Sequence, residues 1–369
     1  MRHHLKRVIV TGMLPGTVLV AGSSIAAPAQ DVEARIDRYL RERPVPGFSG
    51  VVLVAQGDSV LFERAYGLAE AELGVPLAVT HRFNIGSVTK PVTAAAVLRL
   101  TSRGDAALGD PICRFLPSCP DRWRSVSLRH LLSHTSGIPD LFGELPAAPA
   151  DSLRAVVDAA IARHVADSLR SSPGERYAYS NFNYIVLGYV LEVVGGRAWP
   201  EVLEREVFAP AEMSKTEYDD VWNVLPGRAR GYELRDGRLS NTRYHDHAAY
   251  TAGGLLSTAR DLLRFDRALS TGRLIPDSLL RAMTTPGPGD YGLGWQVIRV
   301  FGQRVRNHTG GVTGFASHLA HYDDGTTVIL LSNVEDEPAK STACDIAAVV
   351  FGLGPTPRES GRPSCRPER

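Results

Sequence analysis

A serine and a lysine stand at a spacing that suits nucleophilic catalysis. Ser87 and Lys90 form the pattern Ser-x-x-Lys at the start of a helix predicted over about residues 87–103. Residues three apart share one face of a helix, so the hydroxyl and the amine would point into the same space. A serine nucleophile needs a base within hydrogen-bond reach. Short motifs also arise by coincidence, but no other serine in the chain has a lysine three positions later.

Two later segments hold groups that could complete such a site. The first contains the Tyr-x-Asn pair Tyr179 and Asn181, and the second consists of His308, Thr309, Gly310 and Gly311. A phenol can transfer protons, and an amide can hydrogen-bond a substrate. Glycines allow a backbone to approach a substrate closely.

Each of these residues also has a simpler interpretation. Lys90 could be a surface lysine whose stem lies along apolar side chains. Asn181 could be the N-cap of an apolar helix predicted over 181–195. The paired glycines could form a simple turn. Arg306 shares a strand face with His308 and could meet a substrate carboxylate, although an exposed arginine is the plainer interpretation.

The order and spacing of these motifs resemble the serine β-lactamase and penicillin-binding protein superfamily. The closest likeness is to class C-type members, which include class C β-lactamases, D,D-carboxypeptidases, D-aminopeptidases and β-lactamase-like carboxylesterases. Secondary landmarks look similar as well, at residues 132–139, 252–259 and 291–295. The resemblance extends from about residue 31 to about residue 352.

The resemblance implies how the site residues act. Lys90 would be the base or part of it, once burial has lowered its pKa. Tyr179 would pass a proton to the leaving group and help to activate water afterwards. Asn181 would bind a substrate amide or acyl side chain and keep Lys90 oriented. The neighbouring Tyr177 and Tyr184 are more simply core or surface aromatics.

The third motif would complete the site around the substrate carbonyl. By resemblance, the backbone N–H groups of Ser87 and Gly311 would form an oxyanion hole, with Thr309 and Gly310 beside the substrate. His308 departs from the lysine that many β-lactamases carry there. Because histidine is mostly neutral at pH 7, weak β-lactamase activity is expected, with binding of anionic substrates improving toward pH 6.

These expectations describe a serine hydrolase that acts through an acyl-enzyme on esters or amides. The alternative is a penicillin-binding sensor or scaffold that acylates without turnover. An α/β-hydrolase is disfavoured, because the chain has no Gly-x-Ser-x-Gly elbow. The sequence does not choose between an ester, a D-amino-acid peptide and a β-lactam as substrate. No cofactor is expected, and a monomer is the expected state.

Strand-like segments occur at both ends of the chain, and helical ones lie between. Residues 50–65 predict a hairpin, residues 294–307 and 315–332 predict two more strand pairs, and helices are expected near 31–43, 127–134, 151–169, 181–195, 257–269 and 340–351. This order indicates an α+β protein in which both chain ends form one antiparallel sheet, with a mostly helical second lobe. The resemblance implies the β-lactamase/transpeptidase-like fold.

The first residues of the chain predict export. Residues 1–29 have a basic start, an interrupted apolar stretch and a small-x-small site before Gln30, as in a signal peptide. A catalytic domain is expected over 30–352, and residues 353–369 are expected to be a disordered tail rich in Pro and Arg. A periplasmic or secreted protein without a membrane anchor is the prediction.

Export also bears on the cysteines, which are Cys113, Cys119, Cys344 and Cys365. An even number in an exported chain suggests disulfides, and we favour pairing the first two and the last two, with four free thiols as the alternative. Their spacing does not suggest zinc.

Charge and composition exclude some partners. Hydrophobic content of 44% and charged content of 22% are ordinary for a globular protein, and a net charge of +1 argues against nucleic acid or an anionic membrane. His245, Asp246 and His247 look like metal ligands, but a solvated loop is the plainer interpretation, so no metal is expected. His134, in the first landmark, is expected to be structural.

Overall fold

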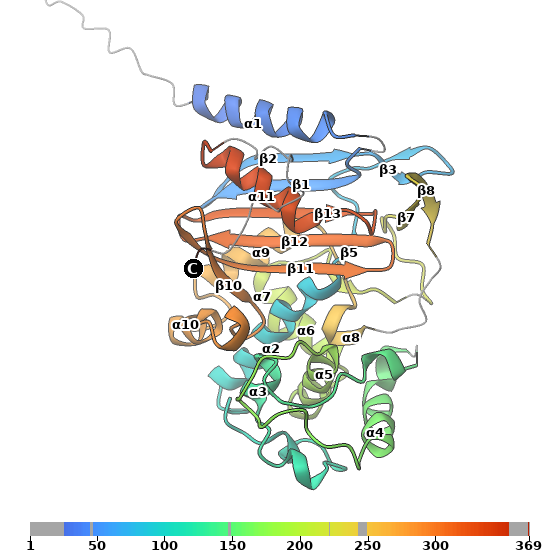
Figure 1. The fold of residues 1–369 in the computed structure, drawn as a ribbon, viewed down its shortest axis with the longest axis vertical. Helices are drawn as coiled ribbons and strands as arrows, with labels where there is room; N and C mark the ends of the chain where they lie inside the picture. The colour runs from blue at the N-terminus through green and yellow to red at the C-terminus, as the bar shows by residue number, and fades with distance from the viewer. Residues whose placement is uncertain are drawn as a thin grey trace, which may run out of the picture.

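A six-stranded antiparallel sheet formed by the two ends of the chain is the centre of the fold (Figure 1). The computed structural model describes residues 26–44, 47–146, 149–220, 222–242, 249–353 and 368. The strand order is β10-β11-β12-β13-β1-β2. The strands are β1 (Gly50–Gln56), β2 (Ser59–Tyr66), β10 (Gln296–Val300), β11 (Gln303–Val312), β12 (Phe315–Tyr322) and β13 (Thr326–Ser332).

The N-terminal and C-terminal strands of the sheet join where β1 pairs with β13, and in this register Gly50 lies opposite Ser332. The predicted α+β class and the joining of the two chain ends in one sheet are confirmed. All three predicted strand pairs are present. Strand β11 continues past the predicted residue 307 to Val312.

The two faces of the sheet belong to two hydrophobic cores, because successive strand residues point to opposite sides. Val52 and Val54 pack in a core with residues of α1 (Ala26–Arg41) and α11 (Ala339–Val350). Val51 and Leu53 face the larger core, which includes α9 (Ala259–Ser270) and the helical lobe. In Figure 1, α1 and α11 lie at the upper part of the sheet and the helical lobe lies below it.

The middle of the chain forms the helical lobe and several short strands. Its α-helices are α2 (Thr89–Ser102), α3 (Leu128–Leu132), α4 (Leu153–Arg163), α5 (Asn181–Gly195), α6 (Trp199–Leu203), α7 (Ala209–Ala211), α8 (Tyr250–Gly253) and α10 (Asp277–Thr284). The short strands are β3 (Leu68–Glu70), β4 (Val75–Pro76), β5 (Phe83–Asn84), β6 (Glu217–Tyr218), β7 (Tyr232–Arg235), β8 (Arg238–Asn241) and β9 (Leu255–Ser257).

Short 3₁₀ helices and one π-helix connect these elements. The 3₁₀ turns are η1 (Gly86–Val88), η2 (Ile112–Arg114), η3 (Asp121–Trp123), η4 (Phe142–Glu144), η5 (Ala150–Ser152) and η7 (Pro288–Asp290), and η6 (Glu204–Phe208) is a π-helix.

Three helix boundaries differ from the predicted ones. The helix expected over 151–169 ends at Arg163, and the ring of the next residue, His164, contacts Asp167 and Glu144. The nucleophile helix begins at Thr89, so Ser87 lies in the 3₁₀ turn η1 before it. The first helix begins at Ala26, inside the segment predicted to be removed as a signal peptide.

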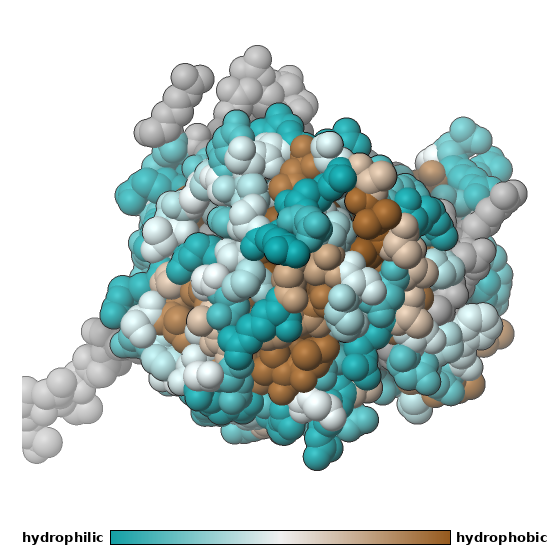
Figure 2. All heavy atoms as spheres, turned by 90° about the horizontal axis from the view of Figure 1, so that it is seen from below, coloured by the Kyte–Doolittle hydropathy of each residue, from teal (hydrophilic) through white to brown (hydrophobic). Residues whose placement is uncertain are grey.

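The hydrophobicity of the helices and of one face of the molecule can be described directly. Within the described ranges, no helix has both the length and the apolar composition of a membrane span. On the face of the helical lobe in Figure 2, hydrophobic patches are interrupted by hydrophilic residues.

Cys113 and Cys119 are bonded to each other in the structure, with their Cα atoms 5.1 Å apart. The other favoured pair includes Cys365, which lies outside the described residues.

Changing Cys113 and Cys119 together to serine should lower the free energy of unfolding only modestly, by roughly 2 kcal/mol, because so short a loop restricts the unfolded chain little. Peptide mapping without reductant checks the bond, and thermal melting of the double variant checks its contribution. Alkylation of both thiols in the native protein would contradict the pairing.

Candidate active site

The nucleophile turn lies between the short strand β5 and helix α2. Ser87 follows β5, and the side chain of Asn84 accepts a hydrogen bond from the backbone N–H of Gly86 at 2.8 Å. The amide nitrogen of Asn84 in turn donates to Asp219 at 2.9 Å. Gly86 has φ +48°, a left-handed conformation that favours glycine. These contacts fix the backbone from which the Ser87 hydroxyl projects.

Lys90 is fully buried beside that hydroxyl. Its Nζ lies 3.0 Å from Ser87 Oγ, 2.7 Å from Asn181 Oδ1 and 2.7 Å from the carbonyl oxygen of Ala252. Burial lowers its pKa well below the ordinary value of 10.5. The interpretation of Lys90 as a surface lysine is therefore wrong.

The contacts of Lys90 orient its lone pair. A neutral amine has two N–H donors and one lone pair. The oxygens of Asn181 and Ala252 can only accept, so they take both donors. The lone pair is then left toward Ser87 Oγ, which is the arrangement that a base for that hydroxyl requires.

Tyr179 contacts the same hydroxyl from the solvent side. Its phenol donates to Ser87 Oγ at 2.8 Å, and the residue remains 39% exposed. The Lys90 Nζ is 4.8 Å from the ring centroid. Desolvation raises the pKa of Tyr179 well above 10, so the phenol keeps its proton at neutral pH and is able to donate it.

His134 fixes the segment that carries Tyr179. Its carbonyl oxygen accepts the N–H of Ala178 at 2.8 Å, and its Nδ1 accepts the N–H of Ser180 at 3.2 Å. The imidazole and the Tyr179 ring have centroids 4.4 Å apart. His134 is fully buried, as the expected structural residue would be.

Asn181 is not the N-cap of its helix. Ser180 holds that position, and its Oγ accepts the N–H of Asn183 at 3.3 Å. Asn181 is the first residue of α5, and its side chain orients Lys90 as the resemblance implied. Tyr184, one turn further along, is a buried core aromatic whose hydroxyl donates to the Leu132 carbonyl.

Strand β11 lies directly against the nucleophile turn because Gly310 on the strand and Gly86 in the turn have no side chains. A Cβ at Gly310 would overlap the carbonyl oxygen of Ile85 and the hydroxyl of Ser317. A Cβ at Gly86 would lie 2.8 Å from the backbone nitrogen of Gly311. Both strand glycines belong to β11, so the interpretation as a turn is wrong. Ser87 and Gly311 are thus close neighbours, as an oxyanion hole requires.

The two glycines allow a matched test. Gly310→Ala should reduce activity by about 100-fold, since small displacements of reacting groups have effects of that size, and should destabilise the fold by about 1–3 kcal/mol through overpacking. A methyl group added at Gly311 would have no atom within 4 Å, so Gly311→Ala should leave the melting temperature unchanged. Melting curves and ester hydrolysis measure both. Equal melting temperatures for the two variants would contradict the steric argument.

The four residues of the third motif alternate between buried and exposed positions along β11. Thr309 and Gly311 are exposed, whereas His308 and Gly310 are buried. Strand β10 pairs with β11 only over residues 303–307, so the outer edge of β11 beyond that point has no strand beside it among the described residues. An extended substrate could pair with this edge.

The imidazole of His308 is neutral, and both of its ring nitrogens are hydrogen-bonded to other protein groups. Its Nδ1 lies 2.9 Å from the Thr309 carbonyl oxygen, which can only accept, so Nδ1 carries the proton. Its Nε2 therefore accepts from the Tyr291 hydroxyl at 2.9 Å. Burial lowers the pKa of His308 to about 3. The expectation that it gains charge toward pH 6 is wrong, because desolvation penalises the charged imidazole.

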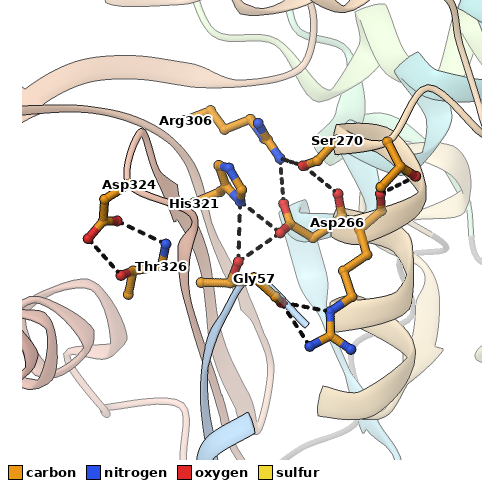
Figure 3. Close-up of polar contacts among 10 residues, drawn as sticks. Gly57, Asp266, Ser270, Arg306, His321, Asp324 and Thr326 are labelled. Atoms are coloured by element: carbon orange, nitrogen blue, oxygen red, sulfur yellow. Dashed lines mark hydrogen bonds and ion pairs between the residues drawn. The ribbon is translucent and has the colours of Figure 1, made fainter. Parts of the chain in front are cut away.

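Arg306 is directed toward Asp266 and Ser270 on α9 (Figure 3). Its guanidinium donates to Asp266 Oδ1 at 2.7 Å and to Ser270 Oγ at 2.6 Å, and its side chain is only 10% exposed. The exposed arginine and the carboxylate-binding arginine are both wrong as interpretations. Asp266, on α9, also accepts from His321 at 2.9 Å, so this cluster joins the helix to the sheet.

Sequence reasoning overlooked three groups that support the site. They are the side chain of Asn84, the carbonyl of Ala252 and the hydroxyl of Tyr291. The last two lie within the secondary landmarks, so their position could have indicated them. His245, Asp246 and His247 lie outside the described residues, and within the described ranges no three His, Cys, Asp or Glu side chains are placed to hold a metal ion.

A serine flanked by a buried lysine and a tyrosine, beside a strand that carries two glycines, is a site for serine acyl transfer. The chain belongs to the Beta-lactamase family, whose model matches residues 32–351. It is 30% identical over 335 residues to penicillin-binding protein 4* of Bacillus subtilis, covering 83% of this chain and 73% of that protein. It is 29% identical over 310 residues to esterase EstB of Burkholderia gladioli, covering 73% of this chain and 78% of the esterase.

Solved structures show the same fold. The penicillin-binding protein from Bacillus halodurans has 25% identity and a TM-score of 0.71, covering 88% of this chain and 98% of its own. The D-amino acid amidase from Ochrobactrum anthropi, complexed with L-phenylalanine amide, has 25% identity and a TM-score of 0.74 over 88% of this chain and 98% of the amidase. This protein is therefore a serine hydrolase that acts through an acyl-enzyme.

Proposed function

We propose that this protein hydrolyses esters or amides of small acyl groups, with Ser87 as nucleophile, Lys90 as base and Tyr179 as proton donor to the leaving group. The single observation that carries the assignment is the convergence of Lys90 Nζ and the Tyr179 hydroxyl on Ser87 Oγ, at 3.0 and 2.8 Å. Both groups are within the reach that proton transfer needs.

The reaction follows from that geometry. Ser87 Oγ attacks the substrate carbonyl while its proton passes to the lone pair of Lys90. The negative charge that develops on the carbonyl oxygen is stabilised by the N–H groups of Ser87 and Gly311. Tyr179 gives its proton to the departing alcohol or amine and is reprotonated from Lys90. Water then attacks the acyl-enzyme and loses its proton to the same pair. The bond from Ser87 Oγ to the acyl group breaks, Oγ regains a proton from that pair, and the acid is released.

Turnover is favoured over a sensor that only acylates. Tyr179 and Asn181 are both in place, so the groups that deacylation requires are present. The test is a panel of simple esters, D-Ala-D-Ala peptides, amino-acid amides and nitrocefin on purified protein. Steady-state product release after the first turnover supports the proposal. A single stoichiometric burst without further product on every substrate would identify the sensor.

We further propose that β-lactam hydrolysis is weak. His308 is buried and neutral, and Arg306 is bound to Asp266, so neither offers charge to a β-lactam carboxylate. The ratio of nitrocefin to neutral-ester turnover should be low and should stay flat from pH 8 to pH 6, because a pKa of about 3 keeps His308 neutral throughout. A rise in that ratio as pH approaches 6 would show that His308 does titrate there.

Export to the periplasm or the medium is part of the same proposal, and it is supported by the composition of residues 1–29. Fractionation of the natural host with an antibody against the protein tests it. Retention of the protein in the cytoplasm with its first residues intact would contradict it.

A further inference from the structure

A chain of three hydrogen bonds joins the nucleophile turn to an ion pair outside the site. The N–H of Gly86, one residue before the nucleophile, donates to Asn84 Oδ1 at 2.8 Å. Asn84 Nδ2 donates to Asp219 Oδ2 at 2.9 Å, and Arg228 donates to Asp219 Oδ1 at 2.9 Å. Asn84 is only 9% exposed and Asp219 only 8%. Hydrogen bonds in such a buried place are stronger than the same bonds in water.

The backbone that carries these side chains is held by neighbouring segments. Strand β5, which ends at Asn84, pairs with β9. The N–H of Asp219 donates to the carbonyl of Gly254 at 2.8 Å, and the N–H of Arg82 donates to the carbonyl of Gly227 at 2.8 Å. Because the backbone positions are held in this way, the chemistry of the side chains decides whether the three bonds can form.

The two ends of this chain of bonds are both donors, which restricts the groups between them. The Gly86 N–H and the Arg228 guanidinium can only donate. A carboxylate offers two accepting oxygens, whereas an amide offers one oxygen and one donating NH₂ group. One amide and one carboxylate therefore satisfy every contact. Two amides would set two donors face to face, and two carboxylates would set two ionised acceptors face to face.

The peptide between Ile85 and Gly86 is the point where the chain of bonds meets the nucleophile turn. Its carbonyl oxygen accepts the N–H of Val88 at 3.1 Å and the hydroxyl of Ser317 at 2.7 Å. Its N–H is the group that Asn84 accepts. Gly86 then turns the backbone at φ +48°, so the direction in which the chain enters the nucleophile depends on both sides of this peptide.

We propose that Asp219 is a positioning residue for the nucleophile and acts through the amide of Asn84 on the peptide that precedes Gly86. The proposal rests on the proposed function and adds a residue to it. The carboxylate of Asp219 holds the amide nitrogen of Asn84, which keeps the amide oxygen directed at the Gly86 N–H. Asp219 takes no part in proton transfer. Its loss should therefore displace the Ser87 hydroxyl and N–H without removing a reacting group.

The experiment exchanges the amide and the carboxylate. Asp219→Asn gives two amides, and Asn84→Asp gives two carboxylates. The double variant, Asn84→Asp with Asp219→Asn, has one of each in the reverse order. Its carboxylate can accept from Gly86 and from the new amide, and the oxygen of that amide can accept from Arg228. All three hydrogen bonds and the net charge are then restored.

The measurement is kcat/KM for p-nitrophenyl acetate, divided by the fraction of sites that a fluorophosphonate titrates, so that unfolded protein does not count. Melting curves report stability separately. Tyr39→Phe is the matched control, because it removes a hydrogen bond of 2.6 Å to the carboxylate of Asp345, between α1 and α11 on the other face of the sheet. This control should melt at a lower temperature and keep the wild-type kcat/KM.

Each single exchange should lower kcat/KM by about 10-fold to 100-fold, since small displacements of reacting groups have effects of that size. The double variant should recover most of this loss although it carries both substitutions, because the two positions are coupled through one contact. Amide hydrogen exchange of residues 84–88 gives a reading independent of activity. Protection of the Gly86 N–H should fall in Asp219→Asn and return in the double variant.

Three results would overturn the proposal while leaving the proposed function standing. One is a wild-type kcat/KM in both single variants, and another is unchanged protection of the Gly86 N–H in Asp219→Asn. The third is a double variant no more active than the poorer single variant, and this comparison still decides if one single variant does not fold. Failure of the proposed function is separately visible as fluorophosphonate labelling that persists in Ser87→Ala.

Discussion

Ser87→Ala will abolish hydrolysis, with kcat/KM falling by on the order of 10⁶, as is typical when the nucleophile of a serine hydrolase is removed. The reason is that Lys90 and Tyr179 both converge on Ser87 Oγ, and among the described residues neither hydrogen-bonds another side-chain hydroxyl that could replace it. The fold should persist, since the turn is held by Asn84 and by the backbone rather than by the Ser87 side chain.

Labelling by a fluorophosphonate probe, read by intact mass, gives the second measurement. The wild type should gain one adduct and Ser87→Ala none. Ser59→Ala is the matched control, because Ser59 is an exposed serine at the far end of the sheet. An adduct on Ser87→Ala equal to that on the wild type would contradict the assignment of Ser87 as the nucleophile.

Lys90→Met will reduce kcat/KM by about 10²–10⁴, the usual contribution of a general base. Methionine fills a similar volume but offers no lone pair to the Ser87 proton. The wild-type rate should also depend on pH in a defined direction. Lys90 works only when neutral, so activity is full above its lowered pKa and is lost as pH falls through that value.

This second prediction is checked by measuring kcat/KM for a neutral ester between pH 5 and pH 9. The acidic limb should be present in the wild type and absent from the residual activity of Lys90→Met. Thr93→Val serves as a control for substitution of a buried polar residue on the same helix. An identical acidic limb in Lys90→Met would assign that titration to another group.

Much of the site could be predicted because its residues lie in short local motifs. Ser87 and Lys90 are three residues apart, and Tyr179 and Asn181 are two apart, so local geometry alone brings each pair together. The closing of one sheet by both chain ends also followed from the order of strand-like and helical segments. The short helices α6, α7, α8 and α10 were not predicted, because so few residues carry little periodic pattern.

The environment of the motif residues could not be predicted from the sequence. Arg306 forms an ion pair with Asp266, which lies 40 residues earlier on α9. No sequence pattern connects that position with the strand. The charge of His308 depends on burial against Tyr291, 17 residues earlier. Contact partners and burial are set by such tertiary neighbours, so the residue types alone suggested the wrong behaviour for both side chains.

The pairing of early and late segments also determines when activity can appear during synthesis. Ser317 donates to the carbonyl of Ile85 across 232 positions, and β13 completes the sheet only after nearly the whole domain has emerged. A ribosome-bound chain that ends before β11 has its nucleophile and base but lacks the Gly311 N–H beside them. Contacts so distant in sequence form late, so the nascent chain is an inactive precursor until its last strands have docked.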